Sequence, residues 1–161
     1  MSKVIFLDRD GVVNEERGDY TWRIEDFRLT IGLKRFIRLV QVKGFEIIII
    51  SNQGGVEKGI YTLEDVEKVH QFLKDELAKE NLYLIDIYYC PHHPNSGKCL
   101  CRKPGSIMLE KAIARYAVDV TESYFIGDSN RDVEAGERVG LTCIKVTAND
   151  NLCDYLKFIK D

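Results

Sequence analysis

The stretch Val4-Ile5-Phe6-Leu7-Asp8-Arg9-Asp10-Gly11 decides the fold, because a short apolar run ends abruptly in two acids and a glycine. Brief apolar runs of this kind, often β-branched, are typical of strands that are buried on both faces of a parallel sheet. Gly11 permits a sharp turn where the strand ends, which leaves room for a ligand. The stretch therefore predicts a buried strand with Asp8 and Asp10 at its carboxyl end.

Four more apolar runs follow the same pattern, at residues 47–50, 85–89, 124–126 and 143–146. Helical patterns lie between them: one covers residues 33–40 and stops at Gly44, one begins with a capping signal at Thr62 and Asp65, and one opens with Pro104 in its first turn. Strands that alternate with helices predict an α/β fold, with a central parallel sheet covered by helices on both faces. Residues 1–161 fit a single domain of this type.

Two segments interrupt this alternation. Residues 12–30 combine charged and aromatic side chains and are predicted to form a short flap above the first strand. Residues 90–101 are predicted to form a long loop that is held by something other than an apolar core. Both segments leave from strand ends, where sheets of this type bind their ligands, so both should border one site.

The composition excludes several classes of protein. Hydrophobic residues make up 45% of the 161-residue chain and charged residues 30%, an ordinary balance for a folded protein. The net charge of −3 argues against a surface that binds nucleic acid. No apolar run approaches the roughly 20 residues of a membrane span, and the first residues do not form a signal peptide, so we expect a cytoplasmic protein without a membrane partner. In that reducing compartment, the five cysteines favour thiols or a metal over disulfides.

Polar residues at the predicted strand ends form four candidate elements of a catalytic site. Asp8 and Asp10 could act as nucleophile and acid, and could chelate a metal through the Asp8 side chain and the Asp10 carbonyl. The alternative is an ordinary turn, in which Asp and Gly are common. Ser51 and Asn52 follow the second strand and precede two glycines, so they could cradle an anion or form another polar turn.

The other two elements lie later in the chain. Arg102 and Lys103 precede the helix predicted at Pro104, and a cation beside helix amides could hold a phosphoryl group, although a solvated pair of charges is the simpler interpretation. Asp128 follows the fourth strand and could bind Mg²⁺. Asp132 could support that site from behind, or could stabilise the N-terminus of a helix.

The four elements, taken in order over most of the chain, resemble the hallmark set of the haloacid dehalogenase superfamily of phosphohydrolases: Asp8/Asp10, Ser51, Lys103 and Asp128/Asp132. The resemblance implies a three-layer Rossmann-like fold and a phosphatase that forms an aspartyl phosphate on Asp8. It also implies that Asp10 protonates the leaving alcohol and then deprotonates the attacking water.

The same resemblance implies ligands and cofactors. Mg²⁺ would be held by Asp8, the Asp10 carbonyl and Asp128, with Asp132 in a supporting position behind the metal. The residues expected to bind phosphate or substrate are Ser51, Asn52, Arg102 and Lys103. No role follows for Arg9, and His70, on a predicted helix, needs none.

The loop Cys90-Pro91-His92-His93-Pro94, followed by Cys99-Leu100-Cys101, offers three sulfurs and two imidazoles. We predict a structural Zn²⁺ site with the ligands Cys90, His92, Cys99 and Cys101. Free thiols are the alternative. His93 is then spare, and the remaining cysteines, Cys143 and Cys153, are expected to be ordinary buried thiols.

This loop narrows the resemblance. A loop that begins with CPHHP and ends with CxCRKP resembles the branch that contains D-glycero-D-manno-heptose 1,7-bisphosphate phosphatase and histidinol-phosphate phosphatase, whose members lack a large cap domain. Residues 51–59 and parts of the flap look closer to the heptose enzyme, whereas the loop is shorter than in many heptose enzymes and no long C-terminal extension follows. A heptose bisphosphate, and hence a role in carbohydrate metabolism, is therefore favoured, with histidinol phosphate as the alternative.

The charges near the site do not decide between these substrates. A second phosphate favours extra cations, for which the candidates are Arg102, Lys58, Arg17 and Arg23. The amine and imidazole of histidinol phosphate favour acids, for which the candidates are Glu15, Glu16 and Asp19.

Other classes of function stay open. A 3′-phosphatase of broken DNA would share the acid motif, but it would need a basic face. A phosphorylated receiver switch would not need the zinc loop or Asp10, and a zinc module with an inactive site is disfavoured because every catalytic position is filled. The favoured partner is therefore a small phosphorylated metabolite. We expect a monomer, because no exposed apolar helix stripe is evident.

Overall fold

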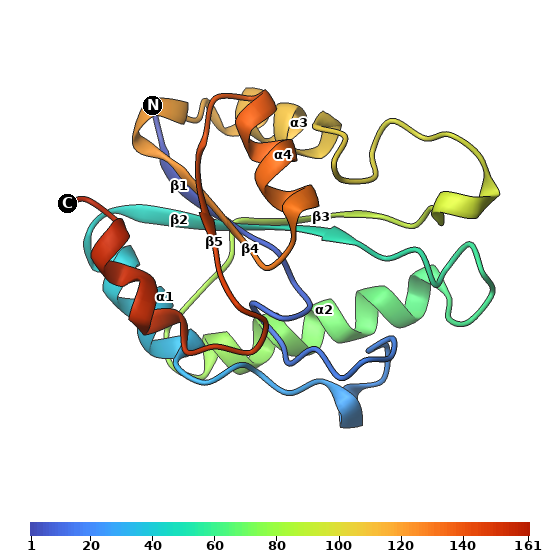
Figure 1. The fold of residues 1–161 in the computed structure, drawn as a ribbon. Helices are drawn as coiled ribbons and strands as arrows, with labels where there is room; N and C mark the ends of the chain where they lie inside the picture. The colour runs from blue at the N-terminus through green and yellow to red at the C-terminus, as the bar shows by residue number, and fades with distance from the viewer.

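A five-stranded parallel sheet forms the centre of the computed structural model, which describes residues 1–161 (Figure 1). The strand order is β3-β2-β1-β4-β5, and every pair of neighbouring strands is parallel. The strands are β1 (Lys3–Leu7), β2 (Phe45–Asn52), β3 (Asp86–Cys90), β4 (Tyr124–Gly127) and β5 (Thr142–Lys145). All five predicted strands are confirmed, with ends that differ by no more than two residues.

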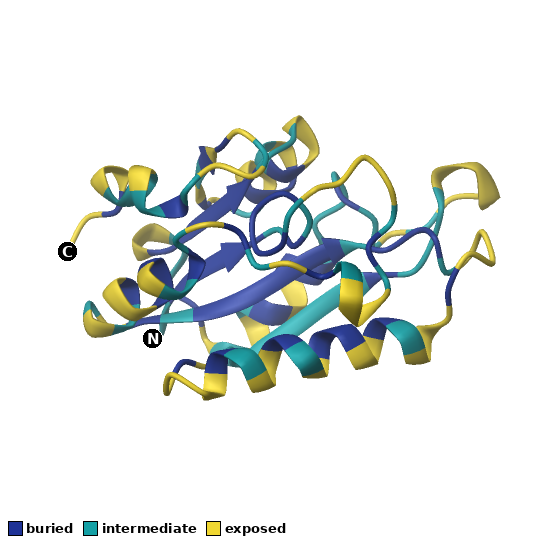
Figure 2. Cartoon of the chain, turned by 90° about the horizontal axis from the view of Figure 1, so that it is seen from below, coloured by how far each residue is buried: buried dark blue, intermediate teal, exposed yellow.

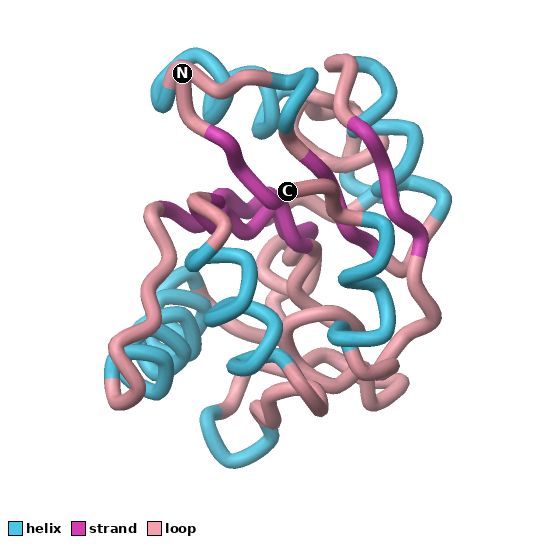
Figure 3. The backbone as a smooth tube through the Cα atoms, turned by 90° about the vertical axis from the view of Figure 1, so that its left-hand side faces the viewer, coloured by secondary structure: helices cyan, strands magenta, loops and turns pink.

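Helices cover both faces of this sheet (Figures 1 and 3). One face carries α1 (Leu33–Val42), α2 (Leu63–Ala78) and the 3₁₀ helix Leu152–Phe158. The other face carries α3 (Ile107–Tyr116) and α4 (Asn130–Arg138). The predicted three-layer α/β architecture is therefore confirmed.

The apolar runs are continuous because the central strands bury both of their faces (Figure 2). On β1, Ile5 and Leu7 belong to a core cluster of 22 buried residues on the side of α1 and α2. Val4 and Phe6 belong to a second cluster of 12 buried residues on the side of α3 and α4. Successive side chains of a strand point to opposite faces, so a strand between two helical layers has no solvent-facing position to fill with a polar residue.

The N-terminus of α2 forms the predicted cap. The Thr62 side-chain oxygen accepts a hydrogen bond from the Asp65 N–H at 3.1 Å, and the Asp65 carboxylate accepts one from the Thr62 N–H at 2.9 Å. This reciprocal pair satisfies two amides that the helix itself cannot.

The start of α3 differs from the prediction. Pro104 does not open the helix, which begins at Ile107. Pro104 instead lies in a turn that is closed by a 2.8 Å hydrogen bond from the Gly105 N–H to the Arg102 carbonyl. Lys103 and Pro104 are the two central residues of this turn, so Lys103 lies before the helix and not in it.

The two segments that interrupt the alternation are confirmed as irregular, and both extend beyond the carboxyl ends of the strands (Figure 1). The flap, residues 12–30, contains a 3₁₀ turn at Ile24–Asp26, and Asn14 forms an antiparallel bridge with Leu29. The loop after β3 contains the 3₁₀ turn Pro94–Ser96. None of the helices combines the length and the apolar character that crossing a bilayer requires.

Candidate active site

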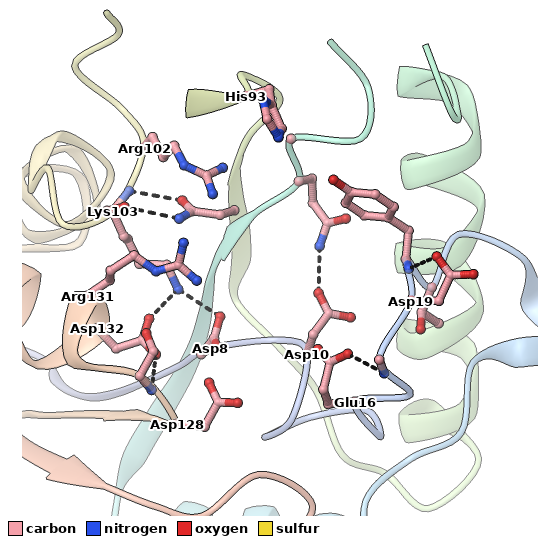
Figure 4. A pocket seen from close by; sticks show the side chains of 17 residues that line it. Asp8, Asp10, Glu16, Asp19, His93, Arg102, Lys103, Asp128, Arg131 and Asp132 are labelled. Carbon is pink, nitrogen blue, oxygen red and sulfur yellow. Dashed lines mark hydrogen bonds and ion pairs between the residues drawn. The ribbon is translucent and has the colours of Figure 1, made fainter. Parts of the chain in front are cut away.

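A polar pocket of about 470 Å³ lies at the carboxyl ends of the central strands (Figure 4). β1 is the strand from which the chain winds outward in both directions along the sheet, and such a reversal point is the usual position of a ligand site in this type of fold. Most of the predicted site residues line the pocket: Asp8, Asp10, Asn52, Arg102, Lys103, Asp128 and Asp132.

Lys103 connects Asp8 with the second acidic pair. Its Nζ donates to Asp8 Oδ1 at 2.7 Å, to Asp132 Oδ1 at 2.6 Å and to the Ile50 carbonyl at 2.8 Å. These acceptors engage all the protons of the ammonium group. The side chains of Lys103 and Asp132 are each only 3% exposed, so water screens the interaction between their charges weakly.

The carboxylates in this cluster outnumber its one ammonium group. Burial raises the pKa of Asp8 well above its ordinary value; Lys103 opposes this rise, and the charges of Asp132 and Asp128 add to it. Burial also acts against the Lys103 ammonium, but Asp8 and Asp132 outweigh this effect and raise the pKa of Lys103. Several carboxylates thus share one ammonium, and a further cation would stabilise the ionised form of Asp8.

The same carboxylates fit a divalent cation that prefers oxygen ligands. Carboxylate oxygens of Asp8, Asp128 and Asp132 lie within 4.8 Å of one another. Asp132 is already engaged, because it accepts from Lys103 and, in the capping box of α4, from the Ser129 N–H at 3.1 Å. Asp8 and Asp128 are therefore the two carboxylates available to a metal, which matches the small number that Mg²⁺ typically takes from a protein. Both roles considered for Asp132, support behind the metal and a helix cap, fit its contacts.

Glycines make this approach of the acids possible. A Cβ atom at Gly11 would collide with the Asp128 carboxylate, and the φ of Gly11 is +88°. A Cβ atom at Gly127 would collide with the side chain of Asp132. The turn after β1 thus needs glycine both for its left-handed backbone and for the space that Asp128 occupies.

Asp10 is held by donors to both of its carboxylate oxygens. Its Oδ1 accepts from Arg9 Nη2 at 2.8 Å and from Asn14 Nδ2 at 3.0 Å, and its Oδ2 accepts from Gln53 Nε2 at 3.0 Å. Burial acts to raise the pKa of Asp10, but the Arg9 charge and these hydrogen bonds outweigh burial and lower that pKa below its ordinary value. In the free protein, Asp10 is therefore a carboxylate that can accept a proton.

The two polar residues at the end of β2 have different surroundings. Ser51 is buried and does not line the pocket; its hydroxyl accepts a hydrogen bond from Gln53 Nε2 at 2.8 Å. Asn52 lines the pocket and binds the backbone of Lys103, accepting from its N–H at 2.9 Å and donating to its carbonyl at 3.2 Å. Neighbouring residues of a strand point to opposite faces, which accounts for the difference.

Arg9, to which the sequence assigns no role, is fully buried behind the pocket. Its Nη2 donates to Asp10 and also to the flap carbonyl of Thr21, at 2.7 Å, and its Nη1 lies 3.4 Å from Nε2 of His70. His70 is buried too, and burial together with the Arg9 charge lowers the pKa of His70 to about 3, so its ring is neutral. The sequence feature that could have pointed to a role for Arg9 is its position between two acids at the end of a buried strand.

The loop after β3 brings the four predicted zinc ligands together, with ligand atoms within 4.8 Å of one another: Cys90, His92, Cys99 and Cys101. Neighbouring pairs lie at 2.8 Å (Cys101 Sγ to Cys90 Sγ), 3.1 Å (His92 Nδ1 to Cys101 Sγ), 3.3 Å (Cys90 Sγ to His92 Nδ1) and 3.7 Å (Cys90 Sγ to Cys99 Sγ). A tetrahedral ion with bonds of roughly 2.0–2.3 Å needs ligand atoms roughly 3.4–3.8 Å apart, so the Cys90–Cys99 pair has this spacing and the Cys90–Cys101 pair would have to open by about 1 Å around an ion. The donor set therefore fits a structural zinc. His93 is not part of it and lines the pocket instead.

Cations gather on one side of the pocket. Arg102 and Arg131 line it, and neither has a carboxylate partner. Burial, and after it the charge of Arg131, lowers the pKa of Arg102. Arg131 was not among the candidates from the sequence, although it directly precedes Asp132 in the first turn of α4, in a stretch already expected to contribute to the site.

The other three predicted cations do not line the pocket. Arg17 forms an ion pair with Asp26, Arg23 lies over the ring of Trp22, and Lys58 lies over the ring of Tyr20. Of the predicted acids, Glu16 and Asp19 line the pocket and Glu15 does not. In Figure 4, Glu16 and Asp19 lie on the side opposite to Arg102 and Arg131.

Comparisons with known proteins identify the family of the chain. A family model described as HAD-hydrolase-like matches residues 100–154. The D-glycero-alpha-D-manno-heptose-1,7-bisphosphate 7-phosphatase of Photorhabdus laumondii is 40% identical over 149 residues, which cover 86% of this chain and 79% of the relative. The D-glycero-D-manno-heptose-1,7-bisphosphate 7-phosphatase of Chlorobaculum tepidum is 38% identical, with 99% and 87% covered.

A solved structure supports the same relationship. The crystal structure of D,D-heptose 1,7-bisphosphate phosphatase from B. bronchiseptica, complexed with magnesium and phosphate, superposes with a TM-score of 0.85 at 29% identity and covers 96% of this chain and 86% of that one. Together with the relatives above 30% identity, this likeness extends over nearly the whole chain. The chain therefore belongs to the haloacid dehalogenase-like hydrolases, among the phosphatases of that family.

Proposed function

We propose that this chain is a Mg²⁺-dependent phosphatase that releases the 7-phosphate of D-glycero-D-manno-heptose 1,7-bisphosphate. The observation that carries the proposal is a single pocket in which Asp8, Asp10, Lys103 and Asp128 meet. The names of the relatives at 40% and 38% identity support the choice of substrate.

The side chains would divide phosphoryl transfer into two displacements. Asp8 attacks phosphorus in line, the bond from phosphorus to the sugar oxygen breaks, and Asp10 gives that oxygen a proton. Asp10 then takes a proton from water, which attacks the same phosphorus and releases Asp8 and inorganic phosphate. Lys103 keeps Asp8 oriented and offers its charge to the transferred oxygens.

The resting state of Asp10 bears on the first step. Because Asp10 is ionised in the free protein, its proton has to enter with the phosphate ester as the monoanion. The negative charge of the bound phosphate raises the affinity of Asp10 for that proton, so Asp10 can pass it to the leaving oxygen.

Two metal ions would complete the site. Mg²⁺ held by Asp8, the Asp10 carbonyl and Asp128 would neutralise charge on the phosphate. Zn²⁺ held by the loop ligands would fix the loop from which His93 and Arg102 reach the pocket.

The cations on one side of the pocket favour a bisphosphate over histidinol phosphate. Arg102 and Arg131 are close enough for one to affect the pKa of the other, yet no carboxylate neutralises them. A second phosphate group would relieve this repulsion and accept hydrogen bonds from the guanidinium groups. An amine has no such partner on this side.

The experiment is phosphate release, with Mg²⁺, from heptose 1,7-bisphosphate, heptose 7-phosphate, histidinol phosphate and a 3′-phosphorylated oligonucleotide. We expect the bisphosphate to have the highest kcat/KM. Arg131→Gln should lower its kcat/KM by about tenfold, the value of one charge-assisted hydrogen bond, and change that of heptose 7-phosphate little. Arg138→Gln, which removes an exposed charge from the other end of α4, is the matched control.

The other outcomes are equally informative. Preference for histidinol phosphate or for the oligonucleotide would refute the substrate and leave the phosphatase chemistry intact. No release from any substrate by folded, Mg²⁺-loaded protein would refute the proposal as a whole. Equal loss on the mono- and bisphosphate in Arg131→Gln would remove the second-phosphate argument.

We infer three further properties of this chain. Residues 1–161 form one phosphatase domain, the chain acts as a monomer on a small phosphorylated metabolite without nucleic acid, and it works in the cytoplasm. Light scattering coupled to gel filtration would test the second, and should give the mass of one 18.5 kDa chain.

A further inference from the structure

A network of buried polar groups surrounds Asp10, and the reaction scheme above leaves it unexplained. Gln53 Nε2 donates both to Asp10 Oδ2, at 3.0 Å, and to Ser51 Oγ, at 2.8 Å. Its Oε1 accepts from the Tyr61 hydroxyl at 2.7 Å. The contact with Asp10 fixes the orientation of the amide, because a flipped amide would turn its oxygen toward an ionised carboxylate, which has no proton to donate.

Arg9 holds the other oxygen of the same carboxylate. Its side chain is 1% exposed, and one nitrogen, Nη2, binds both Asp10 Oδ1 and the carbonyl of Thr21. A buried guanidinium is costly unless it is paired, and Asp10 is its only ion-pair partner. Arg9 Nε has no partner at all, and the nearby His70 ring is neutral. The position therefore holds a charge that packing alone would not favour.

The flap contacts Arg9 directly and contacts Gln53 through Tyr61. Thr21, whose carbonyl binds Arg9, lies in the flap and is buried. Its neighbour Trp22 stacks on the ring of Tyr61, with ring centroids 6.2 Å apart and planes 13° apart. One route thus runs from the flap through Arg9 to Oδ1, and another runs through Tyr61 and Gln53 to Oδ2. Asn14, which lies in the flap itself, also donates directly to Oδ1 at 3.0 Å.

We propose that Arg9 and Gln53 are positioning residues that clamp the Asp10 carboxyl for proton transfer to the leaving oxygen, and that the flap holds this clamp closed through Thr21 and Tyr61. The inference rests on the proposed role of Asp10 as the proton donor. It adds a function for the flap, which secures the orientation of the acid in addition to bordering the pocket.

The clamp has a distinctive chemical consequence. A sugar or alkyl oxygen leaves poorly as an anion and needs a proton, whereas p-nitrophenolate leaves without one. Misalignment of Asp10 should therefore slow the transfer from alkyl phosphates and spare p-nitrophenyl phosphate. A merely structural defect, by contrast, would slow both substrates alike.

The experiment compares kcat/KM, which covers the steps up to cleavage of the ester, for p-nitrophenyl phosphate, phenyl phosphate and a primary alkyl phosphate. The variants are Arg9→Met, Arg9→Lys, Gln53→Met and Tyr61→Phe, with Asp10→Asn as the reference. General acid catalysis contributes about 10²–10⁴-fold, so we expect about 10–100-fold losses on the alkyl phosphate and less than about threefold on p-nitrophenyl phosphate. Arg9→Lys should recover part of the Arg9→Met loss. Inhibition by inorganic phosphate should not change.

Matched controls remove similar groups elsewhere. Tyr116→Phe deletes a hydroxyl bound to Asp86 at 2.7 Å, and Arg38→Met deletes an exposed charge paired with Glu80; neither should alter the dependence on the leaving group. Tyr61→Phe keeps the ring that stacks on Trp22, so it tests the clamp even if Arg9→Met does not fold.

Equal losses on all three substrates in Tyr61→Phe and Gln53→Met would overturn the clamp while Asp10→Asn still showed the leaving-group dependence. If Asp10→Asn itself showed none, the proposed role of Asp10 and the clamp would both fall. Neither result depends on which sugar phosphate is the natural substrate, because the series contains none.

Discussion

At Lys103, burial and charge act in opposite directions on a single side chain. Burial alone would favour the neutral amine, but contacts at 2.7 and 2.6 Å with Asp8 and Asp132 keep the ammonium charged. The Asn52 side chain binds both backbone groups of Lys103, accepting from its N–H and donating to its carbonyl. The position of this one cation therefore decides whether the acids of the pocket can be ionised together.

We predict that Lys103→Met lowers kcat by about 10³-fold or more, because the transferred phosphate and Asp8 lose their nearest charge. The free energy of unfolding should fall by about 3 kcal/mol, since Asp8 and Asp132 remain buried without their partner. Urea unfolding measures this change. Adding Asp132→Asn should recover stability but not activity; a Lys103→Met protein as stable as the wild type would show that the ion cluster does not matter to folding.

Single residues also mark the limit of what the sequence can predict. Asp8, Asp10 and Asp128 follow predicted strands, so the topology alone brings them together. The contacts of Arg9 with Thr21 and His70 are different, because they join positions 12 and 61 residues apart that no local pattern connects. The burial of Ser51 could have been predicted, because the alternation along β2 places it opposite to Asn52.

At the scale of elements, the loop after β3 replaces an apolar core with a cluster of ligands. Cys90 ends β3 and is buried, while the rest of the loop is largely exposed. Burial raises the pKa of the Cys90 thiol, so without a metal this group stays protonated and binds its neighbours only weakly. Zinc would convert these thiols to thiolates and give the loop its main cross-link.

We therefore predict one zinc per chain, measurable by elemental analysis of the purified protein. Cys90→Ser should lose the metal and raise KM more than it lowers kcat, because His93 and Arg102 reach the pocket from this loop. Cys153→Ser, at a cysteine whose thiol donates to the Gly32 carbonyl at 3.5 Å, is the matched control and should keep the zinc. A zinc-free wild type with full activity would contradict this account of the loop.

Elements differed in how well their sequence predicted them. All five strands were found because each apolar run is bounded by polar residues and is too short for a helix. The predicted start of α3 was wrong, because proline is common both at helix starts and in turns. The hydrogen bond from Gly105 to Arg102 that favours the turn depends on the fold of the preceding loop, which the local sequence does not show.

At the scale of the whole molecule, strand register assembles the site. Leu7 on β1 pairs with Ile126 on β4, so Asp8 and Asp128 leave neighbouring strands at nearly the same level. Core clusters on both faces of the sheet fix this register. The stability of the fold is thus a condition for the geometry of the acids, and His70 links that stability to pH.

The unfolded chain binds a proton at His70 below a pH of about 6.5, whereas the folded chain, in which burial lowers the pKa of His70 to about 3, does not. The free energy of unfolding should therefore fall as the pH decreases from 6.5 toward 3, and this group has no effect above 6.5. Between pH 7 and 5 the loss is about 2 kcal/mol. Urea unfolding at both pH values should show this loss reduced in His70→Gln. An identical loss in the variant would contradict the buried neutral histidine.

The central claim is that Asp8 accepts the phosphoryl group, and acid-quench mass spectrometry of the Asp10→Asn variant tests it most directly. With p-nitrophenyl phosphate and Mg²⁺, this variant should still form the aspartyl phosphate but hydrolyse it slowly. The account predicts a gain of about 80 Da, the mass of a phosphoryl group, on the peptide that contains Asp8, and no gain when Asp8→Asn is added. Release of p-nitrophenol in a single turnover with no covalent label at any time would contradict the account.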